Sequence, residues 1–272
     1  MASFETITLE KGMADHIARI TLNRPDRLNA ISRQMEEELG EAIEEVDRDG
    51  EARVLVVTGA GKAFCSGADA RAMAGGQEAA GGYAARGAEE VRQAFRGAQR
   101  IILGLQRMEK PTIAMVNGAA VGAGMDIACA CDIRVGSPSA RFMVAYIRIG
   151  LFPGWGGTWL YPRVMGLSKA AEMLFTADFM EAEEAHRVGL LNRLVPQEEL
   201  ESATMEMARR IAEGPPVALR LAKMMLYKGL EFDLETAMKM AAAAETITLT
   251  SEDHREGVAA FREKRKPSYG GR

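Results

Sequence analysis

Short apolar runs alternate with helical spacings along the first two-thirds of the chain. Residues 4–23 have the pattern of two strands joined by a turn, and the continuous apolar runs 54–57 and 112–116 predict strands covered on both faces. After the first pair, Ser32 stands where a helix N-cap belongs. The apolar positions that follow it are spaced as one helical face, namely Met35, Leu39, Ile43 and Val46. Strand, strand and helix therefore repeat, which predicts a mixed α/β (α+β) core.

The later part of the chain changes in character. A helix over 89–108 and short strands over 133–135 and 142–144 continue the repeat, and the Gly-rich residues 147–161 predict a bend. Beyond Pro162 the spacing is helical almost throughout. We therefore expect the core over residues 1–200 and a helical region over 201–272. Residues 71–88 are rich in Gly and Ala, which predicts a mobile segment or a poorly defined helix.

Composition narrows the class of protein. The 272 residues include 34 Lys and Arg against 38 Asp and Glu, a net charge of −4 that leaves no basic footprint for nucleic acid. No apolar run approaches the roughly 20 residues that span a bilayer, and the N-terminus lacks the pattern of a secretory signal. Three cysteines suit a reducing compartment better than a disulfide framework. These features favour a cytoplasmic enzyme or binding protein without nucleic-acid or membrane partners.

Two loops carry the candidate chemistry, because each follows an apolar strand and opens a helix. One is residues 59–69, and the other is the small-residue stretch 117–124 that leads to Asp126. At such a turn, backbone N–H groups and the positive end of the helix dipole surround a small space. This space suits a developing negative charge.

Other motifs fail at specific positions. Gly61-Lys62 lacks the remaining residues of a phosphate loop, and Ile127 stands where a dinucleotide fingerprint needs its third glycine. Cys129 and Cys131 have the wrong spacing for a zinc site, so we expect small buried side chains there and no metal. None of the three histidines has a nucleophile partner that would indicate a Ser-His triad.

The ordered set of motifs resembles the enoyl-CoA hydratase/isomerase (crotonase) superfamily over essentially the whole chain. Residues 23–30, 63–69, 110–124 and 130–133 carry the resemblance, which continues through residues 150–158 and 189–190 to 256–267. It implies a core of stacked ββα units with two nearly perpendicular sheets, followed by a helical trimerisation region. It also implies a homotrimer or a dimer of trimers, and an acyl-CoA thioester substrate. Coenzyme A is then part of the substrate, and no separate cofactor is expected.

The resemblance assigns roles to residues of both loops. The N–H groups of Ala68 and Ala123 match the pair that holds the thioester oxygen, where preorganised donors stabilise an oxyanion by roughly 3–4 kcal/mol each. Contacts with the substrate are expected from both loops, from residues 27–30 and from the C-terminal region. The matching positions are Arg27, Leu28, Ala30, Ser66, Ala68, Asp69, Ala70, Gly122, Ala123, Phe261 and Lys264. In relatives, the last two positions often belong to a neighbouring subunit; from the sequence alone, a solvated helix end is an equal alternative.

The match departs from the family at the acids. Hydratases of this family use two glutamates, of which the first matches Asp126 and the second matches Tyr146. A phenol has a reference pKa of about 10 and cannot simply replace a carboxylate. Tyr146 therefore either orients water, donates a hydrogen bond or only lines the acyl pocket. A ring-opening isomerase branch of the phenylacetyl-CoA pathway also lacks the second glutamate, but it has an acid where Gly154 stands.

Three functions remain open on this basis. Hydration of a 2-enoyl-CoA, with Asp126 and Tyr146 at the reacting atoms, is the first expectation because it is the commonest reaction of the family. A double-bond shift, from β,γ to α,β or of the phenylacetyl-CoA-pathway kind, needs only one acid/base and is the nearest alternative. An inactive acyl-CoA-binding relative is the second alternative. RNA binding by a fold-only relative is disfavoured by the charge of −4.

Overall fold

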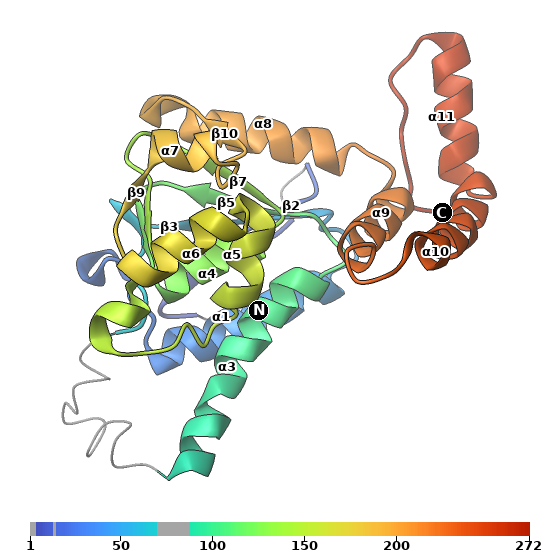
Figure 1. Ribbon diagram of the computed structural model, residues 1–272. Coiled ribbons are helices and arrows are strands. Elements are labelled where there is room, and N and C mark those ends of the chain that lie inside the picture. The colour runs from blue at the N-terminus through green and yellow to red at the C-terminus, as the bar shows by residue number, and fades with distance from the viewer. Residues whose placement is uncertain (1–3, 13–14, 70–86) are drawn as a thin grey trace.

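Successive units of two strands and a helix build the core (Figure 1). The first unit gives both of its strands to the larger of two sheets, and the units that follow give one strand to each sheet. The computed structural model describes residues 4–12, 15–69 and 87–272. The larger sheet has the strand order β1-β2-β3-β5-β7-β10, and the smaller one β4-β6-β8-β9. All neighbouring strands run parallel except β1 with β2 and β8 with β9.

The elements have the following bounds. The strands are β1 (Ile7–Glu10), β2 (Ile17–Leu22), β3 (Val54–Gly59), β4 (Ala63–Cys65), β5 (Thr112–Val116), β6 (Ala119–Val121), β7 (Ile133–Gly136), β8 (Arg141–Met143), β9 (Met180–Glu181) and β10 (Arg193–Leu194). The helices are α1 (Arg33–Arg48), α3 (Ala88–Arg107), α4 (Ala123–Ala130), α5 (Gly157–Met165), α6 (Leu167–Thr176), α7 (Ala182–Arg187), α8 (Leu200–Ala212), α9 (Pro216–Lys228), α10 (Leu234–Leu249) and α11 (Glu252–Glu263). Short 3₁₀ turns are η1 (Pro25–Arg27), η3 (Ala145–Ile149) and η4 (Gln197–Glu199).

Strand β3 lies between two apolar layers, which explains its continuous apolar sequence. Leu55 and Val57 belong to the large core cluster that includes α1 and α3, whereas Val54 and Val56 belong to a second cluster with Leu200 and other residues of α8. Successive side chains of a strand point to opposite faces, so both faces of β3 are covered. The predicted buried strands over 54–57 and 112–116 are confirmed.

The start of α1 was also predicted correctly, because the sequence has a cap there. The Ser32 hydroxyl accepts the N–H of Met35 at 3.2 Å, and α1 begins at the next residue. All four members of the predicted apolar face of α1 are buried. Helix α3 matches the predicted helix over 89–108 within one residue at each end.

Other predictions of local structure were wrong. The two loops each contain a short strand, β4 and β6, which have too few residues to show a pattern but pair with each other. The predicted bend over 147–161 ends at Gly157, where α5 begins, and Pro162 lies inside this helix. The region after Pro162 is not purely helical, since β9 and β10 complete the edges of the two sheets.

Helix α8 packs on the larger sheet, and the chain leaves the core only at α9. In Figure 1, α8 lies over the strands, whereas α9, α10 and α11 lie together to one side of them. Four α8 residues are buried in the second core cluster, namely Leu200, Met205, Ala208 and Ala212. Helix α8 therefore packs as part of the core, whereas the sequence analysis drew the boundary between the core and the helical region at residue 200. The assignment of the helical region to oligomerisation stays a prediction.

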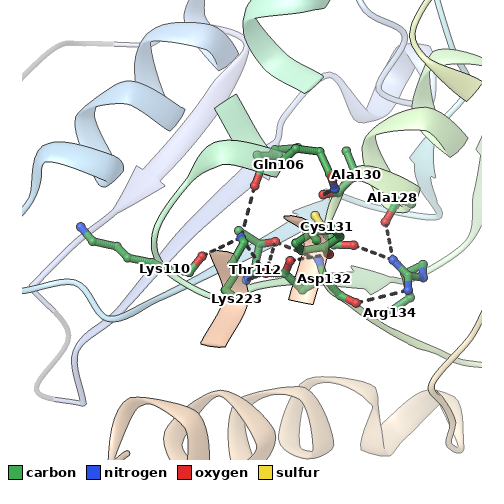
Figure 2. A network of polar contacts seen from close by, with 11 residues as sticks. Gln106, Lys110, Thr112, Ala128, Ala130, Cys131, Asp132, Arg134 and Lys223 are labelled. Carbon is green, nitrogen blue, oxygen red and sulfur yellow. Dashed lines mark hydrogen bonds and ion pairs between the residues drawn. The ribbon is translucent and has the colours of Figure 1, made fainter. Parts of the chain in front are cut away.

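A buried ion pair connects α9 to the core (Figure 2). The Lys223 ammonium lies 2.8 Å from the Asp132 carboxylate and donates to the carbonyl of Lys110 at 2.9 Å. The N–H and hydroxyl of Thr112, the first residue of β5, donate to the same carboxylate oxygen, and the Tyr227 hydroxyl donates to the other at 2.7 Å. Asp132 thus joins α9 to the turn between α4 and β7.

The C-terminal end of α4 is fixed next to this ion pair. The Arg134 guanidinium donates to the carbonyls of Cys131 at 2.6 Å and Ala128 at 3.3 Å, and Gln106 donates to the carbonyl of Ala130 at 2.6 Å. These donors satisfy carbonyls that a helix end leaves without partners, and the cation complements the negative end of the helix dipole. Helix α4 is therefore held in place from α3 and β7.

Two further observations bear on the predictions. Of the helices in the described ranges, none is both long enough and apolar enough to cross a bilayer. The prediction for residues 71–88 and the substrate contact assigned to Ala70 fall almost entirely on residues 70–86, which lie outside the described residues.

Substituting Lys223→Ala is expected to lower the free energy of unfolding by about 3 kcal/mol, because the Asp132 charge stays buried after its cationic partner is removed. The side chains of the pair are only 7% and 14% exposed. The measurement is urea-induced unfolding at one fixed protein concentration. The control is Arg33→Ala, which breaks a pair with 87% and 61% exposed side chains and should change the stability by less than about 0.5 kcal/mol. Equal effects of the two substitutions would contradict this account of the ion pair.

Candidate active site

Helix α4 starts against strand β4 because glycines let the two backbones approach. Gly122 has a φ of +53°, which side chains rarely allow, and a Cβ added to Gly124 would lie 2.3 Å from the carbonyl oxygen of Cys65. Ala123 is the first residue of α4, and its N–H is one of the amides that a helix leaves without an intrahelical acceptor. Within the described ranges, this N–H has no hydrogen-bond acceptor.

A second free amide lies in the loop after β4. The Ile31 N–H donates to the carbonyl of Gly67 at 2.8 Å, and the Asp69 N–H donates to the carbonyl of Ile31 at 3.0 Å. In such a parallel bridge, one strand bonds to the residues before and after a central residue. The N–H of this central residue then points away from that strand. This residue is Ala68, whose N–H finds no acceptor in the described part of the chain.

The two loops are in contact with each other. A Cβ added to Gly67, which has a φ of +94°, would lie 2.8 Å from the carbonyl oxygen of Val121 and 3.8 Å from the amide nitrogen of Ala123. The amides of Ala68 and Ala123 therefore lie in adjacent turns, and their predicted joint contact with a thioester oxygen stays a prediction.

Polar side chains hold the preceding segment, residues 24–30, against the first loop. The buried Asn29 side chain donates to the carbonyls of Ala63 at 2.8 Å and Ala60 at 2.9 Å. The Arg24 guanidinium donates to the carbonyl of Ala30 at 2.5 Å and pairs with the Asp69 carboxylate at 3.2 Å. The predicted contact residue Asp69 is therefore an ion-pair partner of Arg24, a pairing that the sequence did not reveal.

Other predicted contact residues lie around the same turn. The Ser66 N–H donates to the carbonyl of Leu28 at 3.0 Å, and the Ser66 hydroxyl lies 3.4 Å from the carbonyl of Arg27. Arg27 and Leu28 are exposed, whereas Ala30 is buried. The segments 27–30 and 66–69 thus form one surface beside the two free amides.

Asp126 lies one helical turn after Gly122, and its carboxyl is completely buried. The Tyr146 hydroxyl donates to its Oδ2 at 2.5 Å, and the Tyr161 hydroxyl donates to its Oδ1 at 2.5 Å. We call these three residues the Asp126 cluster. Tyr146 comes from η3 and Tyr161 from α5, so three separate elements meet at the carboxyl.

Burial raises the pKa of Asp126 from 3.8 to about 7, because a carboxylate is poorly solvated inside the protein. The two phenol hydrogen bonds oppose this shift, since they stabilise the charged form. A carboxyl with a pKa near 7 can give or take a proton at neutral pH, which is what general acid–base catalysis requires.

Comparison with known proteins identifies the family to which this arrangement belongs. The sequence profile of the enoyl-CoA hydratase/isomerase family matches residues 12–272. The chain belongs to this family. It is 35% identical to a crotonyl-CoA hydratase of Syntrophomonas wolfei, with 98% of each chain covered, and 34% identical to a 1,2-epoxyphenylacetyl-CoA isomerase of Escherichia coli, with 100% of each covered. The crystal structure of an enoyl-CoA hydratase from Bacillus anthracis superposes with a TM-score of 0.89 at 33% identity, covering 98% of this chain and 100% of that one. The predicted family and the mixed α/β crotonase fold are confirmed.

Sequence reasoning missed Tyr161 as a site residue of this family member. Pro162 was interpreted as the end of an irregular bend, so the preceding residue was not placed on a helix. The available signal was the spacing of Gly157 and Tyr161, four residues apart and therefore on one helical face. A Cβ added to Gly157 would lie 2.7 Å from Asp126 Oδ1 and 2.5 Å from the Tyr161 ring, so only glycine leaves room for this contact.

The surroundings of Gly154, where one branch of the family has an acid, leave little room for a side chain. A Cβ added to Gly154 would lie 2.7 Å from the Phe95 ring of α3. Phe95 therefore occupies the space into which a side chain at residue 154 would extend. Asp126 remains the candidate acid of the site.

The structure does not bring two of the predicted contact residues to this site. Phe261 and Lys264 lie at the end of α11, and both are exposed, Phe261 at 86%. Helix α11 stands well apart from α4 in Figure 1, so neither side chain reaches the Asp126 cluster of its own chain. Their contact with a ligand bound to a neighbouring subunit stays a prediction.

The three cysteines are buried thiols whose pKa values lie well above neutral pH. Cys65, Cys129 and Cys131 are free and buried, and burial raises the pKa of each to about 12. The prediction of small buried side chains at Cys129 and Cys131 is confirmed. No group of three potential His, Cys, Asp or Glu ligands for a metal occurs among the residues that the structure describes.

The pKa of Asp126 makes the stability of the protein depend on pH in a specific direction. Because folding raises this pKa from 3.8 to about 7, the folded state binds the proton more tightly than the unfolded state. This contribution to stability is fully present below about pH 4 and is lost as the pH rises to about 7. Between these limits the free energy of unfolding should fall by up to about 4 kcal/mol relative to an Asp126→Asn variant. Urea-induced unfolding of both proteins at several pH values tests this, and parallel pH dependences would contradict it.

Proposed function

We propose that the chain acts on acyl-CoA thioesters and that the N–H groups of Ala68 and Ala123 hold the thioester oxygen. The observation that carries the proposal is the combination of these two amides, which have no acceptor among the described residues, with the buried carboxyl of Asp126 on the same helix as one of them. Removing a proton from the carbon next to a thioester, or adding water to the β carbon of an enoyl thioester, puts negative charge on its oxygen. Each preorganised donor stabilises such a charge by roughly 3–4 kcal/mol.

Coenzyme A is part of the substrate in this proposal, and no separate cofactor takes part. Coenzyme A lies along residues 27–30 and 66–69 in this proposal, where Arg27 and Leu28 offer exposed side chains. The small side chains of Ala68 and Ala123 let a thioester approach the two backbone N–H groups closely.

The same proposal includes a homotrimer or a dimer of trimers, in which Phe261 and Lys264 contact coenzyme A bound to a neighbouring subunit. Large apolar side chains are exposed on the helical region, among them Leu234 at 76% and Met238 at 64%. Burying them between subunits would remove apolar surface from water. We place the enzyme in the cytoplasm, since its three free thiols suit a reducing compartment.

Hydration of a 2-enoyl-CoA is the first candidate reaction. Water adds to the β carbon, the electron pair of the double bond moves toward the thioester oxygen, and the proton of Asp126 goes to the α carbon. The proton released by the water restores the carboxyl, so the enzyme ends unchanged. The pKa of Asp126 near 7 supports a carboxyl that is protonated in part of the molecules at neutral pH.

A double-bond shift is the second candidate, and a specific observation favours it. The position of the second glutamate is a tyrosine that donates to Asp126, and Gly154 replaces the acid of the ring-opening branch. A single carboxylate can take a proton from one carbon and return it to another, which is all that isomerisation requires.

Asp126→Asn is expected to lower turnover by at least about 100-fold, because an amide can neither give nor take the proton. The test uses linear, branched, cyclic and aromatic enoyl-CoAs, with the products analysed by mass spectrometry. A gain of one water identifies hydration, and an unchanged mass with a shifted absorbance identifies isomerisation. Wild-type turnover in the variant would contradict the role of Asp126. Binding of CoA esters without any reaction in the wild type would favour an inactive binding protein.

The proposed oxyanion contacts predict a shift of the thioester carbonyl stretch. On binding, the infrared band of a ¹³C-labelled enoyl-CoA carbonyl is expected to move to lower frequency, because two N–H donors weaken the C=O bond. Asp126→Asn should keep this shift, since the donors are backbone groups. An unshifted band for the bound ligand would show that the two amides do not hold the carbonyl.

A further inference from the structure

Burial distinguishes the three members of the Asp126 cluster. Asp126 and Tyr161 are both 0% exposed, whereas Tyr146 keeps 9% of its surface exposed. A carboxyl without exposed surface cannot touch an acyl group bound outside it. A proton that leaves Asp126 must therefore pass through a neighbour that does have exposed surface.

The hydrogen bonds of the Asp126 carboxyl also indicate Tyr146 as the neighbour that passes the proton on. Each oxygen of Asp126 accepts a phenol O–H, so a protonated carboxyl has to donate to one phenol, which must then turn its own proton elsewhere. Tyr161 is enclosed, with the backbone of Gly157 packed against its ring. Of the two phenols, Tyr146 is the one that keeps exposed surface.

We propose that the Tyr146 hydroxyl carries the proton between Asp126 and the bound acyl group. This inference rests on the proposed function and names the group that touches the substrate. Tyr161 is then a positioning residue, which holds the far oxygen of the carboxyl and does not contact the substrate.

The place of the Tyr146 ring fits this role. A Cβ added to Gly122 would lie 3.8 Å from the ring carbon Cζ, which carries the hydroxyl. Gly122 directly precedes Ala123, the residue proposed to hold the thioester oxygen. The α carbon is bonded to the thioester carbonyl carbon, so in this proposal a substrate held at Ala123 has its α carbon on the side of the site to which Tyr146 belongs.

The proton transfer balances without any further reactant. When the α carbon is protonated, the O–H bond of Tyr146 breaks as the enolate electron pair forms the new C–H bond. At the same time the proton of Asp126 moves to the phenol oxygen, so the cluster ends as a carboxylate and a neutral phenol. Burial and the neighbouring Asp126 raise the pKa of Tyr146 above its usual value, so a phenolate is not stable here and the two transfers occur together. In hydration, the proton of the added water returns through the same hydroxyl.

The test compares Tyr146→Phe with Tyr161→Phe, because each variant removes one hydroxyl from the same carboxyl and keeps the aromatic ring. On the enoyl-CoA that the wild type converts fastest, Tyr146→Phe should lower kcat by at least about 100-fold, with KM changed less than about threefold. Tyr161→Phe should lower kcat by about tenfold or less, the effect of one lost hydrogen bond. Thermal unfolding of both variants checks that they fold equally well.

A measurement on the wild type alone gives a second, independent test. If two protons move in one step, kcat should fall along a curve as D₂O replaces H₂O, whereas direct transfer from Asp126 gives a straight line. A straight line, or a Tyr146→Phe variant within about fivefold of the wild-type kcat, overturns the relay. Equal losses in the two variants also overturn it, since both hydroxyls would then act only on the carboxyl.

An inactive wild type, or an active Asp126→Asn variant, defeats the proposed function itself, whereas an inactive Asp126→Asn with an active Tyr146→Phe defeats the relay alone.

Discussion

The parallel pairing of β4 with β6 is the constraint on which the candidate site depends. Cys65 pairs with Ala120, so the loops that leave the two strands must run side by side. Glycines at the loop positions make this approach possible, because a Cβ at Gly67 would lie 2.8 Å from the backbone of the second loop and one at Gly124 would lie 2.3 Å from that of the first. Any side chain there would push the loops apart and separate the two free amides. The part of the site formed by the two loops thus consists of backbone groups. The glycines in these loops matter because they leave space for the close approach.

Burial of Asp126 is the second constraint, and it acts against stability. Every residue of α4 is buried, and among the described residues the charged form of Asp126 accepts hydrogen bonds from two phenols. The far end of the same helix is held by Arg134 and lies next to the ion pair of Lys223 with Asp132. Because α4 is fixed from several elements, the carboxyl keeps its high pKa and does not relax toward solvent. A poised acid and a rigid helix are therefore two consequences of one packing arrangement.

The sequence predicted the regular parts of the fold and drew attention to the two loops, because these depend on local patterns. Apolar runs and the Ser32 cap revealed β3, β5 and α1, and small-residue motifs located both loops. The contacts between distant side chains were not predictable in the same way. The pairing of Arg24 with Asp69 joins segments 45 residues apart, and the contact of Tyr161 with Asp126 depends on a helix that continues through a proline. No periodicity encodes such contacts, since they follow from how the elements pack.

This difference between backbone and side chains also bears on the reaction. A hydratase and an isomerase are almost equally similar to this chain, at 35% and 34% identity over nearly its whole length. Overall similarity therefore cannot separate the two reactions. In the proposed mechanism, the two amides stabilise a negatively charged thioester oxygen in either case, because they come with the pairing of β4 and β6. What differs between adding water and moving a double bond is where the proton comes from and where it goes. The choice must then depend on the few side chains that face the Asp126 carboxyl, and in this chain two of these are phenols rather than a second acid.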